Sequence, residues 1–207
     1  MTRVLVASSN PGKLADFATA AQLFDIEVAP LPGIKQIQAP EETGTTFEDN
    51  ARLKAEYYSR HSRGEILIAD DSGLVVDALG GEPGVRSARY AEDAGISTHD
   101  PDSANNALLL RKAERIPDPQ RQCAFVCAIA AAQNGTTLHT FTATARGMLL
   151  RATRGNNGFG YDPLFYFPQL SKSFAELSRE EKLNVSHRGA AFRMFLEWMN
   201  SRKQAYV

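Results

Sequence analysis

The sequence predicts an α/β protein built on a mixed β-sheet, and three stretches lead to that prediction. Residues 4–8 form a short apolar run that passes through a turn into a helical pattern, as a strand followed by a helix does. Residues 66–69 form a second apolar run without a helical period, which favours a buried strand. Residues 122–132 and 136–150 are rich in β-forming residues and are separated by Asn-Gly, a strong hairpin signal. Because a hairpin is antiparallel, we expect a mixed rather than a purely parallel sheet.

The overall composition limits the class of protein and its partners. A chain of 207 residues, 43% hydrophobic and 23% charged, is typical of one globular domain with room for two lobes. The net charge of −1 offers no general attraction to nucleic acid, so an anionic ligand needs a local cluster of cations. No apolar run reaches membrane-spanning length, and the N-terminus enters a strand without a cleavage signal. We therefore expect no membrane contact, no export and a cytoplasmic location.

The two cysteines, Cys123 and Cys127, lie at an even offset on a predicted strand. Without a second pair they are too few for a zinc site, and we expect two buried, reduced thiols.

A candidate anion site follows the first strand. Asn10 is a good helix cap and Pro11 suits the first helical position, so a helix is predicted to begin there and to run to about residue 24. Backbone N–H groups at a helix start point outward and bind anions, and Lys13 adds a charge that suits a phosphate. The spacing is not that of a P-loop, and the alternative is an ordinary capped helix with a solvated lysine.

The next segment is predicted to contain a strand at residues 26–29, a loop at 30–45 and a helix at 47–61. Thr45 or Thr46 is expected to cap that helix.

Three side chains of this segment are candidates for a site. Glu41 and Glu42 lie on the loop before the helix, where either is a second carboxylate source for a cation held by Asp71. Lys54 shares a helix face with Asn50, one turn away, and the alternative for Lys54 is an ordinary surface lysine.

Two adjacent acids, Asp70 and Asp71, follow the apolar run at residues 66–69 and precede Ser72 and Gly73. Adjacent strand residues point to opposite faces and Gly73 lets the chain bend, so we expect the strand to end here and to deliver both acids to the edge of the sheet. Ligands bind at that edge in open α/β sheets, and carboxylates suit Mg²⁺ with a water that becomes a nucleophile. The alternative is that Asp70 caps a turn and Asp71 is solvated.

The rest of the chain alternates between predicted elements and turns. We expect a strand at 74–76, a tight loop with Arg86 and Arg89 at 80–90, a polar loop at 91–102 and a helix at 103–115. Further on we expect a strand at 164–167, a helical region from 174 with a capping box from Ser178 to Glu181, and a last helix at 190–203 after residues 186–189.

Glycines on both sides of Phe159 would let a flat ligand approach closely, whereas the alternative packs Phe159 and Tyr161 into the core.

Six short motifs occur in one order along the chain. They are Ser8-x-Asn10-x-x-Lys13, Glu42-Thr-Gly-x-Thr-Phe47-x-x-Asn50-Ala-x-x-Lys54-Ala55, Ala69-Asp-Asp-Ser-Gly-Leu74, Pro83-Gly-Val-x-Ser-Ala-Arg-Tyr90, Gly158-Phe-Gly-Tyr-Asp-Pro163 and Ser186-His-Arg188. Each motif alone is weak, but together they closely resemble the inosine triphosphate pyrophosphatase family over nearly the whole chain. One departure is Glu92, where many relatives carry Gly after Tyr90-Ala91.

The resemblance implies a fold and an activity. The fold would be a long mixed β-sheet flanked by helices, a single domain over residues 1–207 with two lobes and a central nucleotide cleft, usually in a homodimer. The activity would be Mg²⁺-dependent hydrolysis of non-standard purine nucleoside triphosphates (ITP, dITP and XTP) to the monophosphate and pyrophosphate. Such an enzyme cleanses the nucleotide pool.

The same resemblance implies roles for individual residues. Asp71 resembles the family's general base and a metal ligand, with Asp70 and Glu42 as further metal ligands, although Glu41 stays an alternative to Glu42. The substrate-binding residues would be Ser8, Ser9, Asn10, Pro11, Gly12 and Lys13 at the phosphates, Lys54 and Ser72 beside them, Phe159, Gly160, Tyr161 and Asp162 at the nucleoside, and Lys182, His187 and Arg188 at the base.

Other classes of function are weighed against this one. A non-catalytic nucleotide sensor would be favoured by the loss of Asp71 or of the metal acids, and all of them are present. A nucleic-acid-binding protein that reads damaged bases would carry a basic stripe, which the charge balance argues against. A sugar-phosphate phosphatase of the Asp-x-Asp type is a third and weaker alternative.

Overall fold

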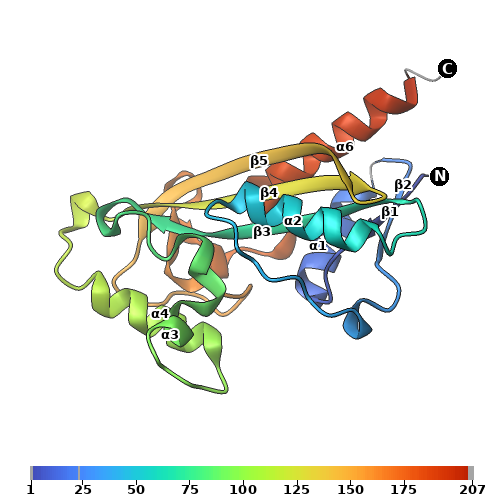
Figure 1. Cartoon of the computed structure of the whole chain (residues 1–207). Coiled ribbons are helices and arrows are strands. Elements are labelled where there is room, and N and C mark those ends of the chain that lie inside the picture. The colour runs from blue at the N-terminus through green and yellow to red at the C-terminus, as the bar shows by residue number, and fades with distance from the viewer. Residues whose placement is uncertain (1, 23, 205–207) are drawn as a thin grey trace. The chain divides into compact units, whose positions relative to one another are not determined.

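The computed structural model describes residues 2–22 and 24–204 and confirms the mixed β-sheet flanked by helices (Figure 1). Within these residues, seven strands are hydrogen-bonded in the order β2-β1-β3-β4-β5-β6-β7. β1 runs parallel to β2 and β3, whereas β6 runs antiparallel to β5 and β7. The strands are β1 (Thr2–Val6), β2 (Ile26–Pro30), β3 (Ile66–Val76), β4 (Gln122–Gln133), β5 (Thr136–Leu149), β6 (Phe165–Phe167) and β7 (Lys172–Ser173).

Helices and short 3₁₀ turns connect the strands. The α-helices are α1 (Pro11–Ala21), α2 (Phe47–Ser59), α3 (Tyr90–Asp93), α4 (Pro101–Lys112), α5 (Arg179–Val185) and α6 (His187–Gln204). The 3₁₀ turns are η1 (Ile34–Gln36), η2 (Asp77–Leu79), η3 (Gly84–Arg89), η4 (Asp118–Gln120), η5 (Asp162–Leu164), η6 (Pro168–Leu170) and η7 (Phe174–Glu176). No helix in the described part of the chain has the length and apolar character needed to cross a membrane.

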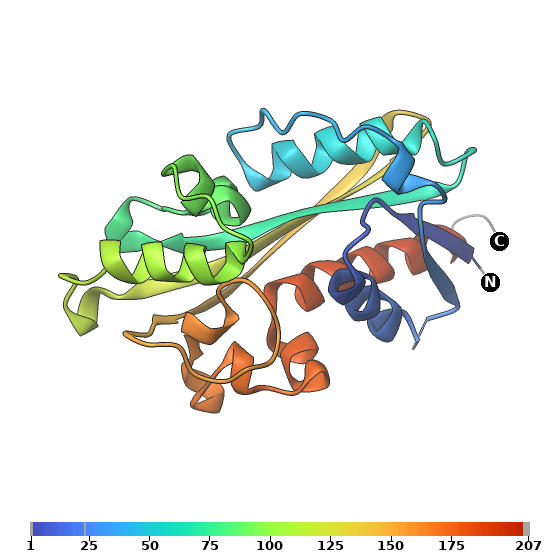
Figure 2. The same ribbon diagram turned by 90° about the horizontal axis from the view of Figure 1, so that it is seen from below.

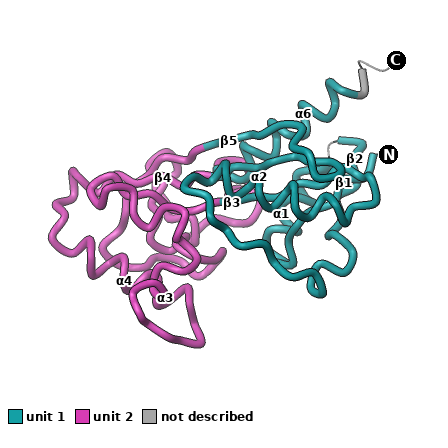
Figure 3. Tube along the Cα trace, in the orientation of Figure 1, with its two compact units in different colours: residues 1–71, 127–143, 187–207 teal, residues 72–126, 144–186 magenta. Residues whose placement is uncertain are grey.

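The chain divides into two compact units (Figure 3). Unit 1 is made of the described residues within 1–71, 127–143 and 187–207, and unit 2 of residues 72–126 and 144–186. Strands β3, β4 and β5 contribute residues to both units.

In unit 1 the two faces of the sheet are covered by different helices. Val4 and Val6 pack with side chains of α1 and α6, while Leu5 packs on the opposite face with Tyr58 of α2. Figure 2 shows α2 on one side of β3 and α6 on the other. This arrangement follows from the strand pleat, because successive side chains point to opposite faces. In unit 2 one apolar core joins strand residues such as Leu74 to α4.

The predicted start of α1 and the predicted hairpin are both confirmed. The side chain of Asn10 accepts hydrogen bonds from the N–H groups of Gly12 (2.8 Å) and Lys13 (3.2 Å). β4 and β5 are joined at Asn134 and Gly135, whose φ angles of 52° and 83° are those the tight hairpin turn requires.

The cap of α2 is Thr46 rather than Thr45, because its hydroxyl accepts the N–H of Asp49 at 3.1 Å. The capping box from Ser178 to Glu181 is confirmed at the start of α5.

One prediction about β3 is wrong. The strand does not end at the two acids but continues as 11 residues from Ile66 to Val76. Gly73 does not bend the chain out of the strand; it allows a close approach, because a Cβ there would lie 2.3 Å from Ser87 Oγ. The two acids therefore lie within the strand, just beyond Ile68, the last residue of β3 that pairs with β1.

The predicted start of the last helix is also wrong. α6 begins at His187, not at residue 190, because the extended Ser186 separates it from α5 and the first two helical side chains are buried. α1 ends at Ala21, before the predicted end at residue 24, and Leu23 lies outside the described residues. Helix α3 lies where a loop was predicted, because its four residues are too few to show a helical period. Strand β7 was not predicted, because its two residues are too few to show an alternating pattern.

Candidate active site

The predicted anion loop ends against a buried acid in unit 1. Lys13, in the first turn of α1, places its Nζ 2.8 Å from Oδ2 of Asp70. Ser8 Oγ accepts the N–H of Asn10 at 3.1 Å, so the loop from Ser8 to Lys13 is ordered by its own side chains. Two N–H groups expected to be open, those of Gly12 and Lys13, are taken by Asn10. The remaining loop residues Ser9 and Pro11 are exposed.

A second cation reaches Asp70 from α6. Nε of Arg188 lies 3.5 Å from Asp70 Oδ2, and its Nη1 lies 3.8 Å from Oδ2 of Asp16. Arg188 and its neighbour His187 are both buried. We call Lys13, Asp70 and Arg188 the Asp70 group.

The Asp70 group resolves the problem of a buried charge. Burial alone would raise the pKa of Asp70, but attraction to Lys13 and Arg188 outweighs it and holds that pKa well below its usual range. Asp70 is thus an ionised carboxylate whose charge is matched inside the protein.

A different group surrounds Asp71. Nζ of Lys54 on α2 lies 2.7 Å from Asp71 Oδ1 and 2.9 Å from Glu42 Oε1, so one ammonium joins two carboxylates. We call Glu42, Lys54 and Asp71 the Lys54 group. Glu41, the alternative to Glu42, is exposed, whereas Glu42 is half-buried.

Asn50 supports the Lys54 group. The sequence predicted only that Asn50 shares a helix face with Lys54. Its Nδ2 lies 3.4 Å from Asp71 Oδ2, and its Oδ1 accepts the N–H of Gly44 at 2.8 Å. Asn50 thus fixes both Asp71 and the loop that carries Glu42. The signal that could have identified it is its position one turn before Lys54 on α2.

The pKa values of Asp71 and Lys54 both differ from those of free side chains. Burial raises the pKa of Asp71, and the nearby Lys54 offsets only part of that rise. Desolvation acts to lower the pKa of Lys54, but attraction to Asp71 and then to Asp70 outweighs it, and the pKa of Lys54 is raised. Asp71 is therefore a stronger base than a solvated aspartate, and Lys54 keeps its proton.

The acids of unit 1 fit a magnesium ion only in part. Among residues 2–22 and 24–204, no three Asp, Glu, His or Cys side chains form a preformed metal cluster. Glu42 and Asp71 meet at Lys54, whereas Asp70 is taken up by Lys13 and Arg188. One or two carboxylates completed by water and substrate phosphates are typical of Mg²⁺ sites, so the Glu42 and Asp71 pair fits such an ion and Asp70 does not.

In unit 2 the glycine loop, residues 158–162, carries one exposed ring. Phe159 is 37% exposed, whereas Tyr161 is buried and its hydroxyl donates to Ser87 O at 2.8 Å. Burial raises the pKa of Tyr161. Asp162 is buried and accepts the N–H of Phe159 at 2.9 Å. Only Phe159 is thus available to stack on a flat ligand, and Tyr161 and Asp162 hold the loop.

Lys182 of α5 joins the glycine loop. Its Nζ pairs with Oδ2 of Asp162 and lies 4.9 Å from the ring centroid of Phe159, within cation–π distance. Lys182 thus belongs to unit 2, whereas His187 and Arg188, predicted to act with it at the base, belong to unit 1. Ser72, the first residue of unit 2, is half-buried on β3.

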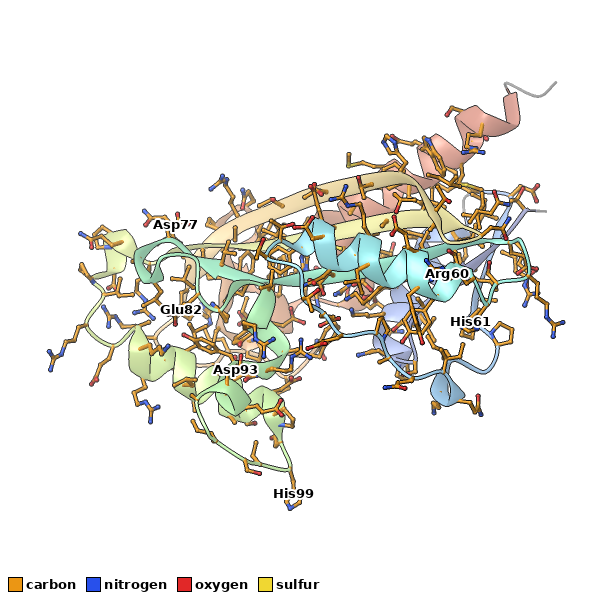
Figure 4. All side chains as sticks on the ribbon, in the orientation of Figure 1. Arg60, His61, Asp77, Glu82, Asp93 and His99 are labelled. Carbon is orange, nitrogen blue, oxygen red and sulfur yellow. The ribbon has the colours of Figure 1, made fainter. Side chains whose placement is uncertain are left out.

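Two further cations of unit 2 are held by acids that Figure 4 labels. Nε of Arg86 lies 2.6 Å from Oδ2 of Asp93, and Nζ of Lys112 lies 2.6 Å from Oε2 of Glu82. Both cations are thus paired with carboxylates of unit 2.

Replacing Asp70 by Asn tests the Asp70 group through stability. We expect the free energy of unfolding to fall by about 3–5 kcal/mol at neutral pH, because the buried Arg188 loses its compensating charge. The pKa of Asp70 is depressed in the folded state, so its contribution is present above the unfolded-state pKa of about 3.9 and is lost as the pH falls through the folded value. The difference in the free energy of unfolding between Asp70→Asn and wild type, measured by urea unfolding, should therefore become smaller as the pH falls below about 3.9.

The matched control is Asp16→Asn, which weakens a longer contact of 3.8 Å to the same guanidinium from a less buried acid and should have a smaller effect. Equal unfolding curves for Asp70→Asn and wild type would contradict the assigned role of Asp70.

Comparison with known proteins places the chain in a family. The model of the Ham1 family matches residues 4–198. A dITP/XTP pyrophosphatase of Acidobacterium capsulatum is 51% identical over 92% of this chain and 95% of its own, and one of Bacillus cereus is 45% identical over 95% and 94%.

Solved structures agree with the sequence comparisons. The Ham1 protein of Staphylococcus aureus has a TM-score of 0.82 and 38% identity, and covers 97% of this chain and 100% of its own. A HAM1 protein from Coxiella burnetii has a TM-score of 0.84 and 34% identity, with the same coverage. The resemblance drawn from the six motifs is confirmed, and the chain belongs to the Ham1 family.

Proposed function

We propose that this protein hydrolyses ITP, dITP and XTP to the monophosphate and pyrophosphate, and so removes non-standard purines from the nucleotide pool. Membership of the Ham1 family supports the reaction class. The observation that carries the proposal is the Lys54 group, in which a carboxylate with a raised pKa lies 2.7 Å from a cation.

Asp71 is the proposed general base. It takes a proton from the attacking water, whose oxygen bonds to the α-phosphorus while the bond from that phosphorus to the bridging oxygen breaks and pyrophosphate leaves. A raised pKa brings a base closer to the operating pH, which makes proton transfer more favourable. Asn50 and Lys54 hold the carboxylate in place.

Cations of unit 1 are proposed to bind the phosphates. Lys13 and Lys54 are both partly exposed, and each can turn one ammonium proton to an incoming phosphate while it keeps its acid. The loop residues Ser8, Ser9, Asn10, Pro11 and Gly12 would surround the phosphate tail. Phosphoryl transfer depends mainly on such positioning and neutralisation.

A magnesium ion is the proposed cofactor, with Glu42 and Asp71 as its protein ligands. When bound, such an ion neutralises phosphate charge and lowers the pKa of water. Lys54 would then give up part of its contact with both carboxylates. We assign Asp70 the structural role of holding Lys13 and Arg188 instead.

The nucleoside is proposed to bind in unit 2, with its base stacked on Phe159 beside Lys182. Lys182 is a hydrogen-bond donor that suits the 6-oxo group of hypoxanthine and xanthine, whereas adenine presents a donor there. His187 and Arg188 are buried in unit 1, so we assign Arg188 to the Asp70 group rather than to direct base contact. We also expect a two-lobed single domain that acts as a cytoplasmic homodimer, without nucleic acid or membrane partners.

The substrate assay compares ITP, dITP, XTP, GTP and ATP with added Mg²⁺. We expect pyrophosphate as the product and kcat/KM for ITP that exceeds that for ATP by roughly 10⁴, because the donor Lys182 suits a 6-oxo group. The family resemblance further implies that GTP, although it shares the 6-oxo group, is a poor substrate. Orthophosphate is measured with and without an added pyrophosphatase. Orthophosphate release without the coupling enzyme, or equal efficiency on ATP and ITP, would refute the proposal.

Replacement of Asp71 by Asn should lower kcat by about 10²–10⁴-fold, because the amide cannot accept the proton. The wild-type rate should fall as the pH is lowered through the pKa of Asp71, since the base works only when deprotonated. Asp77→Asn, on an exposed acid outside the group, is the control. A rate within tenfold of wild type in Asp71→Asn would remove Asp71 from the mechanism.

Chelation by EDTA should stop turnover, and Mg²⁺ should restore it, since the candidate ligands are hard oxygens. Glu42→Gln should raise the Mg²⁺ concentration needed for half-maximal rate by about tenfold, whereas Glu41→Gln should leave it unchanged. Full activity in EDTA would argue against the metal, and equal effects of the two variants would argue against Glu42 as its ligand.

A further inference from the structure

Helix α4 holds one residue of the glycine loop from both sides. The N–H of Gly160 donates to Oδ2 of Asp102 at 2.7 Å, and Nδ2 of Asn106 donates to the carbonyl oxygen of Gly160 at 2.9 Å. Asp102 and Asn106 are one helical turn apart and therefore lie on the same face of α4. Both backbone polar groups of Gly160 are thus bonded to side chains of one helix.

The orientation of the Asn106 amide follows from this contact. A carbonyl oxygen accepts only a donor, so Nδ2 must face Gly160. Asn106 is 8% exposed, and its Oδ1 has no hydrogen-bond partner among residues 2–22 and 24–204. An unsatisfied buried acceptor costs free energy. The amide nevertheless keeps the orientation in which Nδ2 donates to Gly160 and Oδ1 has no partner.

The held residue has no packing contacts at its Cβ position. Gly160 has a φ of +61°, and no atom lies within 4 Å of the place where a Cβ would be. Gly160 has no side chain to pack, so only its backbone can anchor it. The residues on either side have other anchors, because Phe159 N–H donates to Asp162 and Tyr161 donates to Ser87. α4 supplies the anchor that Gly160 lacks.

We propose that Asp102 and Asn106 are positioning residues for the nucleoside: they hold the Gly160 peptide so that the exposed Phe159 ring is presented in its binding position. This inference rests on the proposed function, in which Phe159 stacks on the base. A loop ordered before binding loses less conformational freedom when the ligand arrives, so substrate binds more tightly. Neither residue touches the reacting phosphates in this scheme, so their effect falls on KM.

The same helix offers neighbours that separate positioning from simple support of α4. Asp100 caps the helix by accepting the N–H of Ser103 at 3.1 Å, whereas the hydrogen bonds to Gly160 come from Asp102 and Asn106. Asn105, the buried amide next to Asn106, instead accepts the N–H of Ala91 at 2.8 Å. Loss of either weakens the fold around α4 without releasing the glycine loop.

The test compares Asp102→Ala, Asn106→Asp, Asp102→Asn and Asp100→Ala in the full-length protein. Three quantities are measured: amide hydrogen exchange in residues 156–162, KM and kcat for ITP with Mg²⁺, and the melting temperature. Asp102→Ala and Asn106→Asp should speed exchange at Gly160 and raise KM by about tenfold, with kcat changed less. Asp102→Asn keeps an acceptor for the Gly160 N–H, so KM should stay within about threefold of wild type.

Asp100→Ala should lower the melting temperature while it leaves the exchange of residues 156–162 and KM at wild-type values. Exchange at Gly160 that rises no more in Asp102→Ala than in Asp100→Ala would overturn the inference. Asp102 is exposed, so its alanine variant keeps the test intact if Asn106→Asp does not fold.

Phe159→Ala distinguishes a failure of this inference from a failure of the proposed function. If Phe159→Ala raises KM while Asp102→Ala and Asn106→Asp leave it unchanged, the positioning role is refuted and the nucleoside site stands. If Phe159→Ala also leaves KM unchanged, or wild type does not hydrolyse ITP, the proposed site or function fails. The exchange data then still decide whether α4 orders the loop.

Discussion

The buried carboxylate of Asp70 is the constraint on which the architecture of unit 1 depends. An ionised acid at this depth is tolerated only with matched cations, and Lys13 and Arg188 supply them from α1 and α6. Lys13 and Arg188 are far apart in the sequence, so their shared contact with Asp70 connects α1 to α6. The end of the anion loop and the start of α6 are thereby fixed against β3, before any ligand is considered.

Each unit positions its functional loop by the same device, a pair of side chains one turn apart on a helix. On α2, Asn50 and Lys54 hold Asp71 and the loop of Glu42. On α4, Asp102 and Asn106 hold Gly160. A helix is rigid over one turn, so two such anchors fix both the position and the orientation of a loop that has little packing of its own.

Local patterns made part of this structure predictable. The Asn10 cap and the Asn-Gly hairpin were readable because a few neighbouring residues determine them. The continuation of β3 through its acids was not readable, because it depends on partners from α1, α2 and α6 that only the folded chain brings together. The division of Lys182 and Arg188 between different units was hidden for the same reason, although the resemblance implies that both meet the base.

The strand pleat explains why two adjacent aspartates differ. Because β3 continues, Asp70 points with Ile68 toward α1 and α6, and Asp71 points with Ala69 toward α2. On the first face two cations hold the pKa of the acid down; on the second, burial raises it and one shared lysine offsets only part of the rise. Titratable groups whose environments drive their pKa values apart take different roles. Asp70 is therefore suited to holding the fold together, and Asp71 is suited to accepting a proton in the proposed reaction.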